Sequence, residues 1–195
     1  MHIALVNFKL RHICDFSIKK LMKSKRNIVF LGMMGSGKTT IGKLVSKKLD
    51  QDFFDIDQCI ENKQGMKISE IFAVKGEKFF REIEEKITLD TLNKKNAIIA
   101  LGGGAFLNRK IRECILDEHF SFWLKWHSKI LVNRISRNTK RPIARKLTKK
   151  ELIELVKKRS NIYSKALYKI ECNYLTKFQI SNKVINIYEA NKIDN

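Results

Sequence analysis

The residues with the most specific chemistry form a phosphate-binding loop near the start of the chain. Residues 32–39 have the sequence GMMGSGKT, which fits the pattern G-x-x-x-x-G-K-S/T between a predicted strand and a predicted helix. The glycines let the backbone curl so that successive N–H groups converge on phosphate oxygens, and the helix amino terminus adds positive potential. Lys38 supplies a mobile charge for the β- and γ-phosphates, and the Thr39 hydroxyl is placed to bind Mg²⁺. The predicted nucleotide-binding residues of this loop are Gly35, Ser36, Gly37, Lys38, Thr39 and Thr40.

Two carboxylates accompany the next predicted strand, over residues 53–56. Asp55 and Asp57 are two residues apart, so on a strand both would lie on one face at its carboxyl end, beside the phosphate site. One carboxylate can hold hydrated Mg²⁺, and the other can orient or deprotonate an acceptor hydroxyl. The alternative for Asp57 is helix capping, because a helix is predicted over residues 58–63. The sequence has no N-K-x-D motif for guanine, which argues against a GTPase.

Apolar runs that alternate with helical spacing indicate the elements that position these residues. Strands are predicted at 28–31, 53–56, 97–101, 120–125 and near 169–172, and helices at 40–49, 68 to about 92, 109–116 and 128–137. Gly76 marks a point where the longest helix could break. Buried strands separated by helices predict an α/β fold with three layers, in which a central parallel sheet of about five strands has helices on both faces.

Length and composition limit the class of protein. The chain has 195 residues and is 44% hydrophobic, which is enough to build a core and excludes wholesale disorder. No apolar run approaches the ~20 residues needed to span a bilayer, so we expect no membrane partner. The four cysteines and four histidines are scattered, which predicts reduced thiols, no zinc site and a cytoplasmic location.

The amino-terminal residues 1–26 are predicted to be a basic extension outside a single domain over residues 27–195. Charged residues interrupt the extension, so it lacks the apolar core of a signal peptide. Met22 offers an alternative translation start, and this leaves the role of the extension open.

The net charge of +20 has two interpretations. It could mark a nucleic-acid-binding ATPase, because neutralised phosphates drive that association. Alternatively, the lysines are solvated helix faces on a protein whose ligands are anionic. The second interpretation is favoured, because the basic residues are spread along the chain and no RNP-like motif or zinc finger accompanies them. We therefore expect no specific nucleic-acid partner.

The motifs resemble those of the shikimate kinase family in order and spacing over residues 27–190. The family features present are the phosphate loop extended to Gly42, D-x-D at 55–57, F-R-x-x-E at 80–84, a glycine triplet at 102–104, a lid pattern at 137–142 and R-x-x-x-Y at 159–163. The resemblance implies a P-loop kinase fold with a mobile lid over about 138–150. It also implies transfer of the γ-phosphoryl of ATP, with Mg²⁺, to the 3-hydroxyl of shikimate on the route to chorismate and the aromatic amino acids.

The resemblance further assigns acceptor-binding roles. Guanidinium groups of Arg81 and Arg159 hold the shikimate carboxylate, because a guanidinium binds a carboxylate through two parallel hydrogen bonds. Glu84 lies on the same helical face as Arg81 and can orient it, although such a pair is also common on surfaces. Asp57 orients the reacting hydroxyl, and Asp55 holds Mg²⁺ through water. The glycine triplet forms the wall on which the substrate ring rests; its residues are Gly102, Gly103 and Gly104.

Two further arginines match the nucleotide side of the family. Arg141 corresponds to the lid arginine that stabilises the transferring phosphoryl group, and Arg134 to the arginine that stacks on adenine. Ile143 and Ala144 depart from the two leucines often found in the lid, and residues 173–181 carry no clear adenine signature.

We expect a monomer. The competing function within the same fold is a gluconate or nucleoside monophosphate kinase.

Overall fold

The computed structural model describes residues 27–136 and 147–192 of the chain. Five strands form one sheet in the order β2-β3-β1-β4-β5, and all four pairings are parallel. The strands are β1 (Ile28–Leu31), β2 (Asp52–Asp55), β3 (Ala97–Ala100), β4 (Phe120–Lys125) and β5 (Tyr168–Glu171). The predicted parallel sheet is confirmed.

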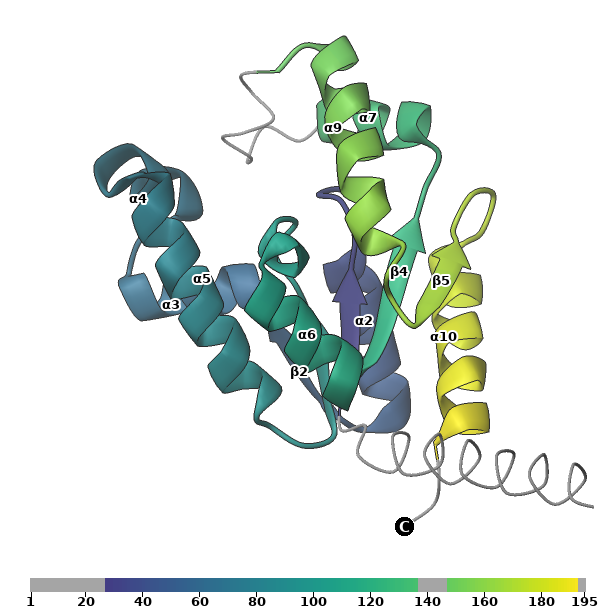
Figure 1. The fold of residues 1–195 in the computed structure, drawn as a ribbon. Coiled ribbons are helices and arrows are strands. Elements are labelled where there is room, and N and C mark those ends of the chain that lie inside the picture. Colours follow the sequence, from purple (N-terminus) through teal and green to yellow (C-terminus); the bar gives the residue numbers. More distant parts are fainter. Residues whose placement is uncertain (1–26, 137–146, 193–195) are drawn as a thin grey trace, which may run out of the picture.

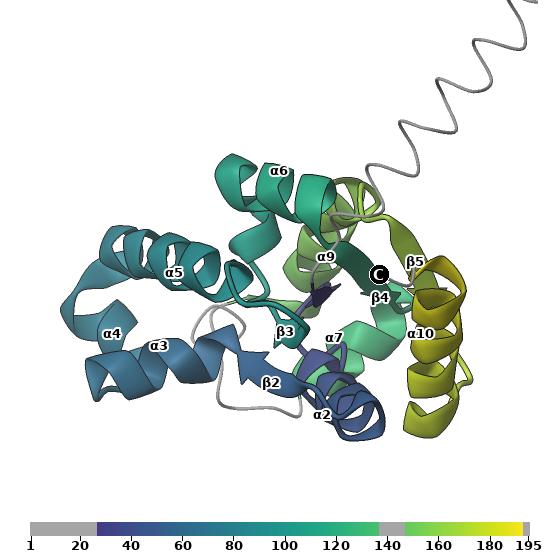
Figure 2. The same cartoon turned by 90° about the horizontal axis from the view of Figure 1, so that it is seen from below.

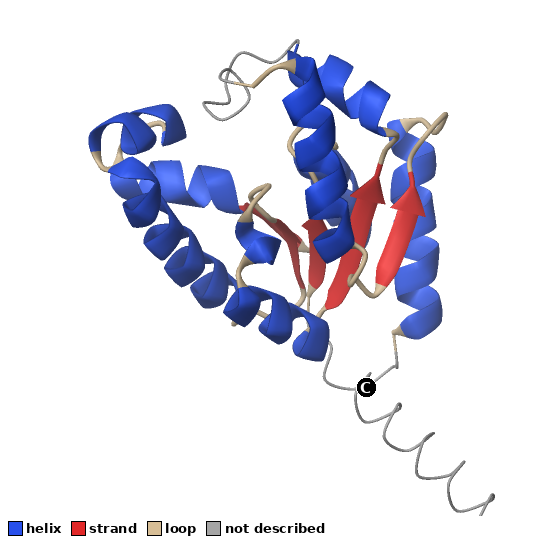
Figure 3. Ribbon diagram, turned by 45° about the horizontal axis from the view of Figure 1, so that its top comes forward, coloured by secondary structure: helices blue, strands red, loops and turns tan. Residues whose placement is uncertain are grey.

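Helices cover both faces of the sheet (Figures 1 and 2). One face carries α2 (Lys38–Leu49) and α10 (Lys177–Asn191), which pack against each other. The other carries α6 (Arg109–Glu118) and α9 (Lys149–Tyr163), with α5 (Gly76–Leu92) alongside α6. The remaining helical elements are α3 (Ile56–Gln64), α4 (Ile68–Val74), the short 3-10 turn η1 (Ala105–Leu107) and α7 (Ser128–Ser136). Figure 3 shows α3, α4 and α5 grouped beyond the β2 edge of the strands. The three-layer α/β architecture is therefore confirmed.

The central strands are buried on both faces, as is typical of a parallel sheet. Every residue of β1 and β3 is buried, as parallel strands covered on both faces require. The edge strand β2 is only partly buried. Helix α2 approaches β2 so closely that a Cβ on Gly42 would overlap the ring of Phe53, so the glycine is needed at this contact.

Several element boundaries differ from the predictions by one or two residues, and two of them bear on the site. Helix α2 begins at Lys38 instead of residue 40. Strand β2 ends at Asp55, and Ile56 already begins α3. The break that was expected near Gly76 is present: the stretch over 68–92 is two helices, and the φ of 79° at Gly76 lies in the left-handed region that glycine tolerates.

A buried asparagine fixes the start of the central strand. The Nδ2 of Asn27 donates to the carbonyl oxygens of Leu92 (3.0 Å) and Lys94 (2.8 Å), and its Oδ1 accepts from the N–H of Ala97 (3.0 Å). Asn27 thus joins β1 to the connection between α5 and β3, at the amino end of the sheet. The phosphate loop leaves β1 at the opposite end.

Within the part of the chain that the structure describes, no helix is long and apolar enough to cross a membrane.

Candidate active site

The phosphate loop curls around its own lysine. Gly35 and Gly37 have φ values of 76° and 91°, which glycine adopts without the steric cost of a side chain. Lys38 begins α2, and its Nζ donates to the carbonyl oxygens of Gly32 (2.9 Å) and Met33 (3.1 Å). The loop borders a pocket of about 690 Å³, lined by Met34, Gly35, Gly37, Lys38, Thr39, Thr40, Asp55, Asp57, Leu101 and Ile135. Five of the six predicted loop residues therefore line one pocket, and the sixth, Ser36, is buried behind it.

Asp55 connects the loop to the end of β2. Its Oδ2 accepts a 2.6 Å hydrogen bond from Thr39 Oγ1. Its Oδ1 accepts from the N–H groups of Asp57 (3.1 Å) and Gln58 (3.4 Å), so Asp55 caps α3. The prediction that both aspartates lie on one strand face is wrong, because the strand ends at Asp55 and Asp57 lies in the first turn of α3. Helix capping was the alternative role considered for Asp57, but the residue that caps α3 is Asp55.

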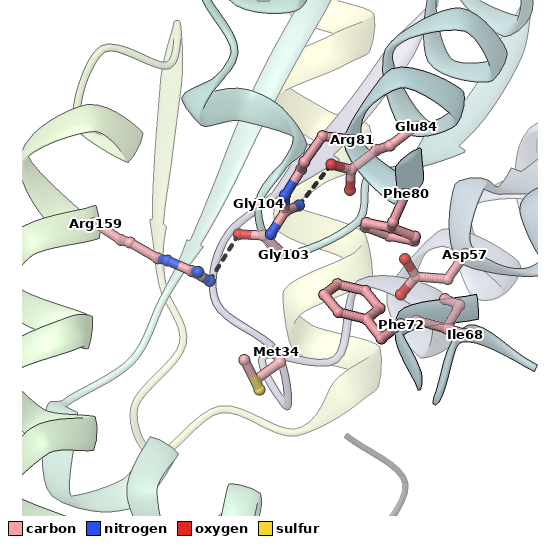
Figure 4. A pocket seen from close by; sticks show the side chains of 10 residues that line it. All are labelled: Met34, Asp57, Ile68, Phe72, Phe80, Arg81, Glu84, Gly103, Gly104 and Arg159. Carbon is pink, nitrogen blue, oxygen red and sulfur yellow. Dashed lines mark hydrogen bonds and ion pairs between the residues drawn. The ribbon is translucent and has the colours of Figure 1, made fainter. Parts of the chain in front are cut away.

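A second pocket adjoins the first (Figure 4). It has a volume of about 440 Å³ and is lined by Met34, Asp57, Ile68, Phe72, Phe80, Arg81, Glu84, Gly103, Gly104 and Arg159. Met34 and Asp57 line both pockets. Asp57 therefore stands at the boundary between the phosphate loop and the second pocket, where a group that acts on an acceptor hydroxyl would need to be.

Arg81 is held by two glutamates of its own helix. Its Nη1 donates to Glu84 Oε2 (2.6 Å), and its Nε and Nη2 donate to Glu77 Oε1 (3.2 and 3.0 Å). Burial raises the pKa of Glu84, although the charge and hydrogen bond of Arg81 oppose this shift. Burial by itself lowers the pKa of Arg81, but the carboxylates of Glu84 and Glu77 outweigh it and the net shift is upward. Arg81 is thus a fixed cation in the pocket.

Arg159 reaches the same pocket from α9, on the other side of the glycine triplet (Figure 4). Its side chain is largely buried, and its Nη1 donates to the carbonyl oxygen of Gly103 (3.3 Å). Its buried Nε has no hydrogen-bond partner within residues 27–136 and 147–192. Two guanidinium groups from separate helices therefore face one cavity, as the proposed acceptor requires.

The glycine triplet lies between these charged groups. A Cβ on Gly104 would lie 2.5 Å from Arg81 Nη1, and one on Gly102 would lie 2.5 Å from Glu84 Oε1 and 2.9 Å from Asp57 Oδ1. Larger residues would displace the side chains that line the pocket. The triplet is a wall that leaves room for the charged groups around it.

Arg134 lies at the loop side of the site and stacks on a tryptophan. Its Cζ is 3.6 Å from the ring centroid of Trp126, and the Trp126 Nε1 donates to the carbonyl oxygen of Ser36 (2.9 Å). The resemblance assigned Arg134 to adenine, and in this structure one face of its guanidinium is covered by Trp126. Arg141 lies outside the described residues, as does most of the predicted lid. The end of the predicted lid range is helical, because Thr148 caps α9 and Lys149 begins it.

Several residues of the site were missed by sequence reasoning. They are the apolar side chains of the second pocket, the ion-pair partner of Arg81 and the tryptophan under Arg134, namely Met34, Ile68, Phe72, Phe80, Glu77 and Trp126. Sequence signals existed for Glu77, which precedes Arg81 by one helical turn, and for Phe80 and Met34, which stand in the F-R-x-x-E and phosphate-loop motifs. The others depend on contacts between elements.

Known proteins share this arrangement. A model of the shikimate kinase family matches residues 34–189. The shikimate kinase of Thermodesulfovibrio yellowstonii is 40% identical over 165 residues, which cover 84% of this chain and 95% of the relative. That of Bacillus subtilis is 38% identical over 169 residues, which cover 83% of this chain and 88% of the relative.

 The shikimate kinase of Bacillus pumilus is 39% identical over 170 residues, which cover 83% of this chain and 89% of the relative.

Solved structures agree with these relatives. The shikimate kinase from Acinetobacter baumannii in complex with shikimate superposes with a TM-score of 0.81 at 30% identity, and the match covers 90% of this chain and 99% of that one. A deoxyadenosine kinase from M. mycoides, at 16% identity and a TM-score of 0.57, shares the fold alone. The family match over most of the chain and the identity with these relatives lead to one conclusion: this chain belongs to the shikimate kinase family of ATP-dependent kinases.

Proposed function

We propose that the protein transfers the γ-phosphoryl group of ATP to the 3-hydroxyl of shikimate, which gives shikimate 3-phosphate and ADP. The observation that carries this proposal is the shared boundary of the two pockets. Arg81 and Arg159 line the acceptor pocket, and Asp57 stands where that pocket meets the phosphate loop. A carboxylate held by the arginines would therefore leave a hydroxyl of the same molecule beside the phosphate site.

The acceptor pocket combines anion binding with an apolar surface. The guanidinium groups suit a carboxylate, because each can donate two parallel hydrogen bonds to it. The apolar lining residues suit a carbocyclic ring and are Met34, Ile68, Phe72 and Phe80. Gluconate also carries a carboxylate, but its open polyol chain offers no ring to cover these side chains. A nucleotide acceptor would also offer an anion to the arginines, but it does not call for the combined arrangement of Asp57, Arg81, Gly103 and Arg159.

Proton handling at the acceptor falls to Asp57. Its carboxylate accepts the hydrogen bond of the 3-hydroxyl and points the oxygen lone pair toward the γ-phosphorus. The hydroxyl oxygen forms the new P–O bond as the bond to the β-phosphate oxygen breaks, and the hydroxyl proton leaves toward Asp57. Lys38 exchanges its contacts with Gly32 and Met33 for phosphate oxygens and offsets the negative charge that develops there.

The oxygen donors at the mouth of the loop fit Mg²⁺. Thr39 Oγ1 and Asp55 Oδ2 lie 2.6 Å apart beside the phosphate pocket. Mg²⁺ in kinases is held by one or two protein oxygens together with phosphates and water. Thr39 and Asp55 are the residues that would hold it, and Asp55 would do so through water. When bound, the ion neutralises charge on the phosphate oxygens.

The nucleotide-side arginines complete the proposal. Arg134, supported by Trp126, presents its planar group for stacking on adenine. Arg141 is proposed to contact the transferring phosphoryl group from the lid, by its place in the sequence motif. The same proposal includes a single kinase domain over residues 27–195, with a lid over about 138–150.

A coupled assay of ADP release tests the function directly. Purified protein with Mg-ATP should turn over shikimate and leave gluconate and nucleoside monophosphates unused. Turnover of one of those compounds, without turnover of shikimate, would reject the assignment. A mass spectrum of the product identifies the phosphorylated hydroxyl after fragmentation.

The remaining proposals concern assembly, partners and location. We expect a monomer, no specific nucleic-acid partner and a cytoplasmic enzyme with reduced thiols, which is consistent with Cys59 and Cys172, since neither forms a disulfide in the described residues. Sedimentation velocity measures the oligomeric state. Fluorescence anisotropy with labelled DNA and RNA tests the other interpretation of the +20 charge, which requires steeply salt-dependent binding and nucleic-acid-stimulated ATP turnover.

A further inference from the structure

A buried tyrosine behind the acceptor pocket has no assigned role. Tyr163 lies one helical turn after Arg159 on α9, so both side chains are on the same side of the helix. We propose that Tyr163 is a positioning residue that holds Gly103 and, through it, Arg159 in the geometry that receives the substrate carboxylate. This inference rests on the proposed function of the pocket.

Tyr163 can act only through other residues. Its side chain is 2% exposed, and it is not among the residues that line the acceptor pocket. Its hydroxyl donates a 2.5 Å hydrogen bond to the carbonyl oxygen of Gly103. Arg159 Nη1 donates to the same oxygen over a longer distance, 3.3 Å. The tyrosine therefore makes the shorter of the two bonds that fix this carbonyl.

The hydroxyl keeps its proton under the conditions of the reaction. Burial raises the pKa of Tyr163 to about 12, although the nearby charge of Arg159 lowers it. Tyr163 is therefore a hydrogen-bond donor at neutral pH and carries no charge that would compete for the guanidinium. A carbonyl oxygen has two lone pairs, so both donors can be satisfied at once.

Gly103 needs such an anchor. Glycine has the least conformational restriction of its own, so hydrogen bonds must fix the wall of the pocket. Arg159 in turn depends on the wall, because its Nε has no hydrogen-bond partner in the described parts of the chain and its Nη1 has only Gly103 and the weak acceptor Met33 Sδ (3.8 Å). Loss of the Tyr163 hydroxyl would let the carbonyl turn, and the guanidinium would turn with it.

The competing explanation is that Tyr163 only fills space. Its ring packs against Trp123, with 6.2 Å between ring centroids. Tyr163→Phe keeps this packing and removes the hydroxyl alone. Tyr188→Phe is the matched control, because Tyr188 is also buried but packs on Phe120, and no hydrogen bond links it to Gly103 in the described residues.

The test compares steady-state kinetics with direct binding. Tyr163→Phe should raise the KM and the calorimetric Kd for shikimate about fivefold, as expected for one lost hydrogen bond. The kcat and the KM for ATP should stay close to wild type, and Tyr188→Phe should change none of these values. Partial unfolding of the variant would raise the apparent Kd for both ligands, so an unchanged KM for ATP shows that a rise for shikimate alone is not a folding effect.

A double-mutant cycle tests the route through Arg159. The penalty of Tyr163→Phe should largely disappear in an Arg159→Lys background, because the lysine no longer uses the fork that Tyr163 positions. Unchanged shikimate KM and Kd in Tyr163→Phe, or equal penalties in both backgrounds, would overturn the inference. If the wild-type protein itself does not phosphorylate shikimate, the proposed function fails instead, so the two failures are distinguishable.

Discussion

The two halves of the site are built in different ways. The phosphate loop comes from one continuous stretch after β1 and offers mainly backbone groups, with Lys38 as its cation. The acceptor pocket collects side chains from α3, α4, α5 and α9 around the glycine triplet. In the proposed function the loop recognises phosphate, which is common to all nucleotides, whereas the pocket recognises one acceptor. Specificity thus resides in the half that needs the whole fold to assemble it.

Lys38→Ala should have the largest effect and should damage the donor half. Removal of the cation that stabilises the transferring phosphoryl group should lower kcat by about 10³-fold, with the fold intact by circular dichroism. Lys43→Ala, on an exposed part of the same helix, is the control and should retain wild-type kcat. A kcat within tenfold of wild type would show that Lys38 is dispensable.

Arg81→Lys should damage the acceptor half alone. An ammonium cannot form the two parallel hydrogen bonds of a guanidinium, so the Kd for shikimate should rise about 30-fold, equivalent to about 2 kcal/mol. Calorimetry should find the ATP affinity nearly unchanged. Arg109→Lys, an exposed arginine paired with Glu113, is the control. Equal loss of both affinities would indicate a structural arginine and would remove the distinction between the halves.

Gly102→Ala tests the wall between the pockets. The added methyl group would press on Glu84 and Asp57, so the KM for shikimate should rise about tenfold, in line with the cost of overpacking. Gly65→Ala adds a methyl in open space at a φ of 62°, so it should cost about 1 kcal/mol of stability without changing the kinetics. Similar kinetics in both variants would mean that the wall tolerates side chains.

Glu84→Gln tests the smallest effect, which is on stability. The folded-state pKa of Glu84 lies above its ordinary value of 4.5, chiefly because of burial, so the folded protein holds this proton more tightly than the unfolded chain. The contribution of Glu84 to stability should therefore be full below pH 4.5 and fall as the pH rises through the raised pKa. Urea unfolding should show the wild type losing stability relative to Glu84→Gln over that range.

The contrast between the halves also explains what the sequence could predict. The loop motif is contiguous and was placed correctly on a strand–loop–helix unit. The parallel sheet followed from buried strands that alternate with helices, but periodicity does not determine the strand order, and it did not reveal that β2 ends at Asp55. Asp57 reaches the site from the first turn of a helix, so its position was right and the local reason was wrong.

The acceptor pocket could be inferred only through the family resemblance. Nothing in the spacing of Arg81 and Arg159 shows that α5 and α9 face one cavity, because that depends on how the helices pack on the sheet. Trp126 and Tyr163 act through hydrogen bonds to the carbonyl oxygens of distant loops, which leave no local pattern. Contacts of this kind become visible only in three dimensions.

Both ends of the described fold lie away from the catalytic edge. Asn27 secures the start of β1 at the amino end of the sheet, and α10 runs back from the far edge to finish at Asn191 near the same end (Figure 1). A dye or a glass-surface tether attached beside Asn191 would stand at the opposite end of the sheet from both pockets. The protein is therefore well suited to immobilised, single-molecule observation of turnover.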